Sequence, residues 1–89
     1  MKVSNMYSNN GKQVPNQFII DNGNKTLFQS YKTIVAVKEN GKVTLDSNAL
    51  EYSNTTLKYL KQFLNTSDSK KQLQAKIENG FYQVEDLNN

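Results

Sequence analysis

Three Asn-Gly pairs divide the first half of the chain, at Asn10-Gly11, Asn22-Gly23 and Asn40-Gly41. Asn-Gly supplies the positive φ angles that two-residue hairpin turns require, so such pairs are signals of tight turns. The segments between the pairs are short and rich in β-branched and aromatic residues, as strands are. We therefore expect an antiparallel meander of three or four strands over residues 17–46, and the hairpin around Asn40-Gly41 is its clearest element.

The apolar periodicity changes after the last predicted strand. Leu57, Leu60 and Leu64 recur at helical spacing, with polar side chains on the opposite side. Either Ser53 or Asn54 can cap the start of this helix, since both side chains accept hydrogen bonds from free backbone N–H groups. The pattern predicts an amphipathic helix of about three turns.

A second helix is expected after residue 68. Ser69 and Gln72 have the spacing of a capping box, and Gly80 supplies a typical C-terminal stop. Phe81–Val84 then predicts a short strand or an apolar clasp that returns to the core. Strands over 17–46 followed by helices over 54–79 predict an α+β fold, in which a small antiparallel sheet has a helical hairpin packed on one face.

The composition sets the limits of the fold. The 89 residues, 36% of them hydrophobic, predict one domain over 1–89, with residues 1–14 as a flexible start. Cysteine and histidine are both absent, so we expect neither a disulfide nor an ordinary zinc site. No apolar run has the length of a transmembrane helix and the N-terminus has no secretory pattern, so we expect a cytoplasmic protein without membrane contact.

The sequence contains few residues that could act in catalysis. Without His or Cys, the only candidate bases are neutral lysines and eight carboxylates, which are scattered along predicted turns and helix ends. Glu85-Asp86 is the only adjacent acidic pair, and it is weak as a metal site. No glycine-rich nucleotide loop occurs. We therefore expect no catalytic residues, no metal and no cofactor.

Positive charge is concentrated in the predicted helices. All eleven basic residues are lysines, and residues 54–77 carry five of them against one acid. Lys58 and Lys61 share the polar side of the first helix, while Lys70 and Lys71 stand in the first turn of the second, where the helix dipole favours an anion. A solvated surface explains such a run equally well as a phosphate-binding surface.

The segment Tyr52–Lys58 gathers four hydroxyl groups, an amide and a lysine at a helix start. N-capping needs one such residue, whereas Ser53, Thr55 and Thr56 together exceed that need, and these side chains commonly contact nucleic-acid phosphates. Among the other aromatic residues, Phe18 and Phe28 fit the core better than a base-stacking platform. Tyr31 lies between two predicted strands, where either role is open.

The same segments carry a family resemblance. Tyr-Ser-x-Thr-Thr-x-Lys at the first helix start resembles a motif of a family of small proteins from tailed bacteriophages, the crAss-like phages among them. The similar segments are Asn16–Ile20, Ser30–Val37, Asn40–Asp46, Tyr52–Leu64, the residues Ile77, Gly80 and Tyr82, and Asp86–Asn88. Many relatives have His after the motif lysine where this chain has Tyr59, so no role of that His carries over. The resemblance implies an origin but no particular activity.

Together these patterns predict a phage accessory protein that binds nucleic acid, double-stranded DNA with low sequence selectivity, in the cytoplasm of the infected bacterium. Lysines would neutralise phosphates, hydroxyls would fix the backbone, and two tyrosines would flank the groove. The expected contacts are Ser53, Thr55, Thr56, Lys58, Lys61, Lys70, Lys71, Tyr31 and Tyr52. So small a module binds weakly alone, so we expect a homodimer or higher oligomer. The alternatives are a module that docks on a host or phage protein, such as an anti-defence inhibitor, and a minor structural protein of the virion.

Overall fold

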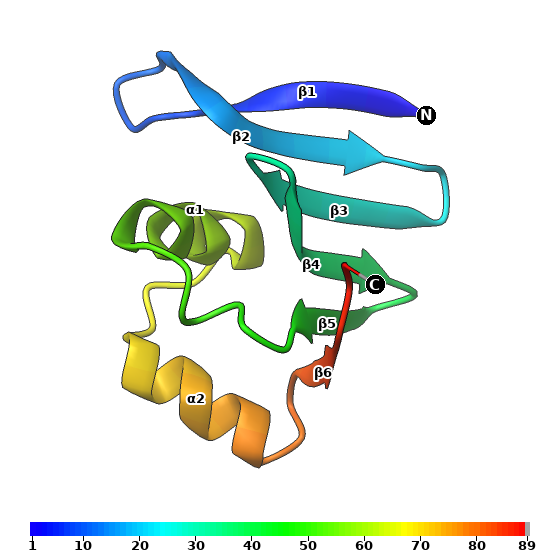
Figure 1. Cartoon of the computed structure of the whole chain (residues 1–89), viewed down its shortest axis with the longest axis vertical. Helices are drawn as coiled ribbons and strands as arrows, with labels where there is room; N and C mark the ends of the chain where they lie inside the picture. Colours follow the sequence, from blue (N-terminus) through cyan, green and yellow to red (C-terminus); the bar gives the residue numbers. More distant parts are fainter. Residues whose placement is uncertain (89) are drawn as a thin grey trace.

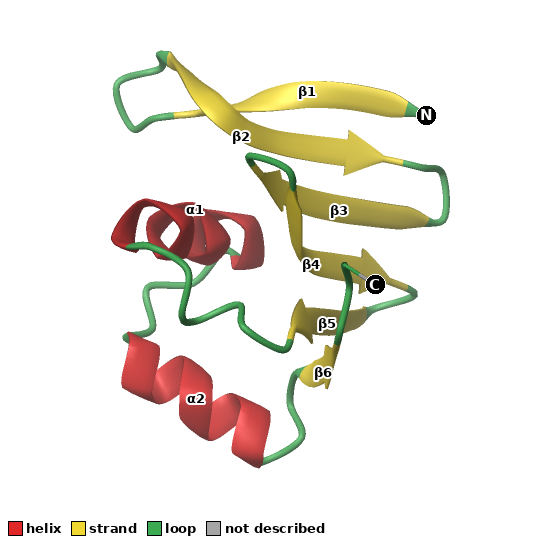
Figure 2. Cartoon of the chain, in the orientation of Figure 1, coloured by secondary structure: helices red, strands yellow, loops and turns green. Residues whose placement is uncertain are grey.

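The computed structural model describes residues 1–88 and consists of one six-stranded sheet with two helices on one side (Figures 1 and 2). In chain order the elements are β1 (Lys2–Tyr7), β2 (Gln13–Asp21), β3 (Lys25–Ser30), β4 (Thr33–Glu39), β5 (Lys42–Asp46), α1 (Asn54–Leu64), α2 (Lys70–Glu78) and β6 (Gln83–Glu85). The strands lie in the sheet in their sequence order, and every pair is antiparallel except β5 with β6.

The prediction of a three- to four-stranded antiparallel sheet is therefore wrong, although the α+β character is present. The additional strand at the N-terminal edge is β1, from a segment that the sequence analysis assigned to a flexible start. Its residues are mostly polar because an edge strand buries little. Only Met6 enters the core, at 5% exposure. A tight reversal whose Gly11 has a φ of 78° joins β1 to β2, so the Asn10-Gly11 pair was the signal for this strand.

The other additional strand, β6, makes the sheet mixed. Its three residues pair in parallel with β5, through Thr44 with Gln83 and Leu45 with Val84. Parallel neighbours need a crossover connection, and here that connection contains both helices. The sequence predicts a short strand or an apolar clasp at Phe81–Val84, and the strand lies at Gln83–Glu85. Its parallel pairing could not be predicted, because it depends on where the two helices place the following chain.

The predicted turn at Asn40-Gly41 and the predicted helix caps at Ser53 and Ser69 are confirmed. Asn40 and Gly41 have φ values of 53° and 78°, and they join β4 to β5 as a two-residue turn between Glu39 and Lys42. The Ser53 side chain caps α1 by accepting a hydrogen bond from the backbone N–H of Thr56. The capping box at the start of α2 is formed by Ser69 and Gln72, as its spacing indicates.

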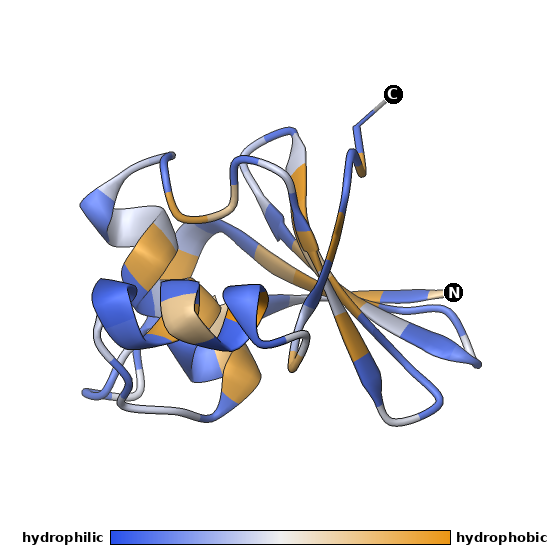
Figure 3. Ribbon diagram, turned by 90° about the horizontal axis from the view of Figure 1, so that it is seen from below, coloured by the Kyte–Doolittle hydropathy of each residue, from blue (hydrophilic) through white to orange (hydrophobic). Residues whose placement is uncertain are grey.

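The core lies between the sheet and the two helices (Figure 3). Phe28 of β3 is fully buried and stacks on Phe63 of α1, with ring centroids 5.8 Å apart. Leu73 brings α2 to the same cluster. The Lys38 ammonium closes the C-terminal end of α1: it donates to the Phe63 carbonyl, lies 4.5 Å from the Phe63 ring centroid, and has its pKa lowered by burial.

The opposite side of the sheet is not covered by the helices, and its side chains form two rows in register. The first row runs through Val3, Ile20, Leu27, Val37, Thr44 and Gln83, one residue from each strand. The second runs through Asn5, Phe18, Gln29 and Ile34. We call these two rows the open face. Its six apolar side chains are partly to largely exposed and lie outside the core cluster.

The Asp46 carboxylate joins three parts of the chain at the end of β5. One oxygen accepts from the backbone N–H of Leu87 at 3.0 Å and from the Asn88 amide at 3.1 Å. The other accepts from the backbone N–H of Asn48 at 3.1 Å and from the Tyr52 hydroxyl. Asn88 also pairs with both backbone groups of Ile34, in place of a β5 residue at that position. The C-terminal segment therefore crosses the end of the sheet as a strap (Figure 1).

Asp46 predicts a stability that falls in acid. Burial by itself would raise the pKa of Asp46, but the hydrogen bonds from Tyr52, Leu87, Asn48 and Asn88 hold that pKa below its ordinary value. The stabilisation is therefore complete above the ordinary pKa of about 3.9 and is lost as the pH falls through the lower, folded value. We expect Asp46→Asn to lower the free energy of unfolding at neutral pH by about 2 kcal/mol, because all four donors lose an anionic acceptor and two of them face an amide NH2 instead.

Urea unfolding from neutral pH to strong acid measures both effects. Asp46→Asn should also flatten the acid limb of the stability curve. Glu78→Gln is the matched control, because this exposed carboxylate makes no hydrogen bond within the part of the chain that the structure describes. An unchanged acid limb in Asp46→Asn would contradict the assignment.

Candidate binding site at the start of helix α1

A small cleft lies where the β3–β4 turn meets the start of α1. Its volume is about 280 Å³. Its lining joins four of the predicted contact residues to two neighbours that the sequence analysis did not select. The lining residues are Ser30, Tyr31, Thr33, Tyr52, Ser53 and Thr56. Segments well separated in the chain thus form one site, and the cleft itself contains no lysine.

Two of the predicted hydroxyls are already committed to the fold. Thr56 is 3% exposed, and its hydroxyl lies 2.9 Å from that of Ser30, which is also buried. The Ser53 hydroxyl donates to the Thr56 hydroxyl at 3.1 Å while it accepts from the Thr56 backbone N–H. These bonds fasten the first turn of α1 to the end of β3. Ser53 and Thr56 thus line the cleft with hydroxyls that already have intramolecular partners.

A buried amide extends this polar layer beneath the sheet. Gln17 of β2 pairs in register with Ser30 and is 1% exposed, yet its Oε1 has no hydrogen-bond partner. Polar groups buried in this way are unusual, because each loses its hydration. A polar residue within the run of β2 was the sequence signal, but its relation to the α1 start depends on the pairing of β2 with β3.

Tyr52 stands on one side of the cleft and is 39% exposed. Its hydroxyl donates to Asp46, and burial, followed by that hydrogen bond and the nearby carboxylate charges, raises the pKa of Tyr52 to about 12. The phenol therefore stays protonated at any physiological pH. The hydrogen bond fixes the side chain, while part of its ring remains accessible to a ligand.

Tyr31 stands on the other side and is 59% exposed. Its φ of 57° lies in the left-handed region, which is costly for a bulky side chain. The turn is held there by two hydrogen bonds of 2.7 Å: the Tyr31 N–H donates to the Asn16 carbonyl, and the Gln29 amide donates to the Tyr31 carbonyl. A strained backbone thus displays an aromatic ring to solvent, an arrangement that is characteristic of functional sites.

Two predicted residues of α1 remain free on its outer surface. Thr55 and Lys58 are both exposed and lie three positions apart, so they share one side of the helix. The Lys58 ammonium lies 5.5 Å from the Tyr59 ring centroid. Lys61 is partly buried, and its charge lowers the pKa of Asp68 together with the larger effect of the hydrogen bond from Lys76.

The remaining predicted lysines lie on α2. Lys70 and Lys71 line a separate shallow hollow of about 580 Å³ with Gln74, Ala75 and Glu78. Lys70 also approaches Glu51 at 3.5 Å, as an exposed ion pair of little energetic weight. The helical lysines are thus divided between two helices, and three of the five lie under the influence of a carboxylate. The structure does not gather them around the tyrosine cleft.

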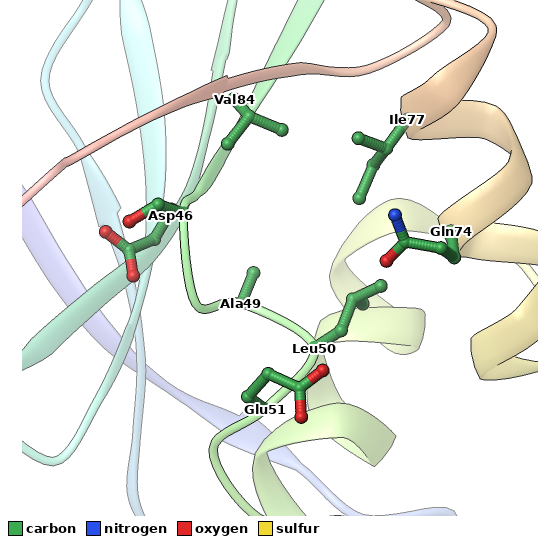
Figure 4. A pocket seen from close by; sticks show the side chains of 8 residues that line it. Asp46, Ala49, Leu50, Glu51, Gln74, Ile77 and Val84 are labelled. Carbon is green, nitrogen blue, oxygen red and sulfur yellow. The ribbon is translucent and has the colours of Figure 1, made fainter.

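A third hollow, of about 290 Å³, lies between α2 and the loop after β5 (Figure 4). Its walls include Ala49, Leu50, Ile77 and Val84. The Asp46 carboxylate points away from the hollow toward its own hydrogen-bond partners. The polar lining residues are Asp46, Ser47, Glu51 and Gln74, so the wall is mixed in character. It lacks a set of converging charged groups.

Within residues 1–88, the described part of the chain, no group of three or more acidic, His or Cys side chains is placed to hold a metal ion. None of the helices there has the length and apolar character needed to cross a membrane.

Stability measurements test the structural role of the Ser30 and Thr56 hydroxyls independently of ligand binding. We expect Thr56→Val to lower the free energy of unfolding by about 1–2 kcal/mol, because it leaves the Ser30 hydroxyl buried without its partner. Ser30→Ala combined with Thr56→Val should cost less than the sum of the single changes. Urea unfolding of the four proteins in this cycle measures the coupling.

Thr55→Val is the matched control, because it makes the same chemical change on the exposed side of the same turn. Its effect should stay within about 0.5 kcal/mol. Strict additivity in the Ser30 and Thr56 cycle would contradict the assigned hydroxyl contact.

Comparison with known proteins adds a family but no activity. Searches of curated proteins and of solved structures found no match to this chain. The model of a family of unknown function, DUF8033, matches residues 1–79, which include the whole cleft and both helices. The chain belongs to this family of unknown function, DUF8033.

Proposed function

We propose that this protein binds nucleic acid at the start of α1. The protein would contact the phosphate backbone of the nucleic acid, and Tyr31 and Tyr52 would contact a base or a sugar. The observation that carries the proposal is the strained, exposed Tyr31 facing the same cleft as Tyr52. The sequence resemblance supports a phage accessory role, in which the protein would act in the cytoplasm of the infected bacterium.

The electrostatics support an anionic ligand. The chain has a formal net charge of +3 and a pI of about 9.2. Among the described residues, only Lys70 and Lys76 form salt bridges with acidic side chains. Lys58 on α1 and Lys32, next to Tyr31, are exposed near the two elements that form the cleft. Such lysines attract a phosphate backbone without reading its sequence, which agrees with low selectivity.

The site assigns different tasks to the predicted contact residues. Ser53 and Thr56 act indirectly, because their hydroxyls hold the helix start in position. Tyr31, Tyr52, Thr55 and Lys58 are the residues available for direct contact. Lys61, Lys70 and Lys71 would supply a more distant positive field, which strengthens the encounter with a long nucleic acid more than it strengthens local contact.

Affinity for a labelled duplex of mixed sequence, measured by fluorescence anisotropy over a range of salt concentrations, tests the proposal. We expect Tyr31→Asn to weaken binding roughly tenfold through loss of ring contact. The same variant should fold at least as stably, since Asn tolerates the left-handed conformation. Lys58→Gln should reduce the slope of log affinity against log salt by about 1.

Lys2→Gln is the control for charge, because Lys2 is exposed at the end of the sheet remote from Tyr31. It should leave the affinity nearly unchanged. A single strand of the same sequence, run in parallel, determines which form of nucleic acid the tyrosines prefer. The proposal fails if nothing binds at low ionic strength, or if binding does not depend on salt. Capture of a protein partner that survives nuclease treatment, with no duplex binding, would favour a protein-docking module.

A further inference from the structure

We propose that the open face binds a second copy of this chain, so that two sheets pack face to face in a two-fold symmetric dimer. The site at the start of α1 has no part in this inference, which concerns the side of the sheet that the helices leave uncovered.

The open face carries more apolar side chains than the solvated face of an antiparallel sheet normally does. Four consecutive strands contribute Val3, Ile20, Leu27 and Val37 to one row, each directly opposite the next. Phe18 and Ile34 occupy the adjacent row. In an antiparallel sheet with one solvated face, that face is normally polar. Here both faces are apolar at their centres, as in a sheet that is covered on both sides.

The described residues of one copy do not supply that cover. Both helices pack on the other side, where Phe28, Ala36 and Leu45 are fully buried (Figure 3). The C-terminal strap reaches only the edge of the open face, through the contacts of Asn88 with Ile34 and Asp46. Val3 remains 56% exposed.

The size of the open face suits a weak dimer. Six strands spaced by about 4.8 Å give a width of about 24 Å, and six residues of strand give a length of about 20 Å. Each copy therefore offers about 500 Å², and two copies would bury about 1,000 Å², the lower limit for a specific interface. We accordingly expect a dissociation constant on the order of 10–100 µM.

The charged side chains of the open face lie around the two apolar rows. Lys25, Glu39 and Lys42 lie in register at one end of the strands. Glu85 is paired with Asp46, at the level of the second row, and it lines a groove of about 390 Å³ with Lys42 and Val37. A two-fold axis that runs across the strands between the two rows would place each row of one copy over the other row of its partner.

The same axis also matches the apolar rows. It places Ile20 over Phe18 of the second copy and Val37 over Ile34, and the reciprocal contacts follow by symmetry. The amide of Gln29, which would face Leu27, already donates to the Tyr31 carbonyl. A second copy therefore matches the apolar rows of this face, which favours it over an unrelated partner.

Sedimentation equilibrium of the full chain across the expected range of concentration tests the dimer. The wild-type protein should shift from monomer to dimer, and Leu27→Lys, at the centre of the open face, should stay monomeric. Circular dichroism and thermal unfolding check that this variant folds. Val3→Lys provides a second test that cannot damage the core, because Val3 is largely exposed on the edge strand. It should weaken the dimer at least tenfold.

Phe81→Ser is the matched control, since Phe81 is 67% exposed but lies outside the open face. It should dimerise like the wild type.

A chain that remains monomeric throughout the range would overturn the proposal. So would a dimer that persists in both Leu27→Lys and Val3→Lys, because its interface would then lie elsewhere. None of these results depends on whether nucleic acid binds, so the dimer and the proposed function can fail separately.

Discussion

The carboxylate of Asp46 holds together parts of the fold that otherwise share few contacts. It ends β5, turns the following loop through Asn48, fixes Tyr52 beside the start of α1, and binds the strap through Leu87 and Asn88. Each partner donates a hydrogen bond to one buried anion. These bonds replace the hydration that the carboxylate loses at 3% exposure. The same residue therefore determines where the sheet stops and where the candidate site begins.

The turns and helix caps could be predicted from the sequence, because they depend on residues that are close together in the chain. Asn40-Gly41 adopts the two positive φ angles that its turn demands, and the caps at Ser53 and Ser69 form as their spacing indicates. The strand count could not be obtained in this way. A polar edge strand such as β1 carries almost no apolar alternation, and β6 becomes a strand only because the helices return the chain to β5. Both depend on contacts between residues that are distant in sequence.

The candidate site could likewise be predicted only in part, where it depends on residues close together in the sequence. Tyr52 and the hydroxyls at the α1 start could be selected from their unusual density, and Tyr31 from its place between two strands. That Ser53 and Thr56 act on each other and on Ser30 follows only from the pairing of β3 with the helix start. The lysines were grouped by their proximity in sequence, whereas the turn between α1 and α2 distributes them over two surfaces. Charge counted along a chain is a poor guide to charge in space when a helical turn intervenes.

The crossover between β5 and β6 has a consequence for the order in which the molecule assembles. Strands β1 to β5 are joined by short turns, so their pairing closes small loops and is entropically inexpensive. By contrast, the partners of β6 and of the strap lie far back in the sequence, so these contacts close much larger loops. We therefore expect β6 and the strap to form late and to open early in a local fluctuation. Such an opening would remove two of the four donors to Asp46, which also accepts from Tyr52, and so would couple the strap to the site at the start of α1.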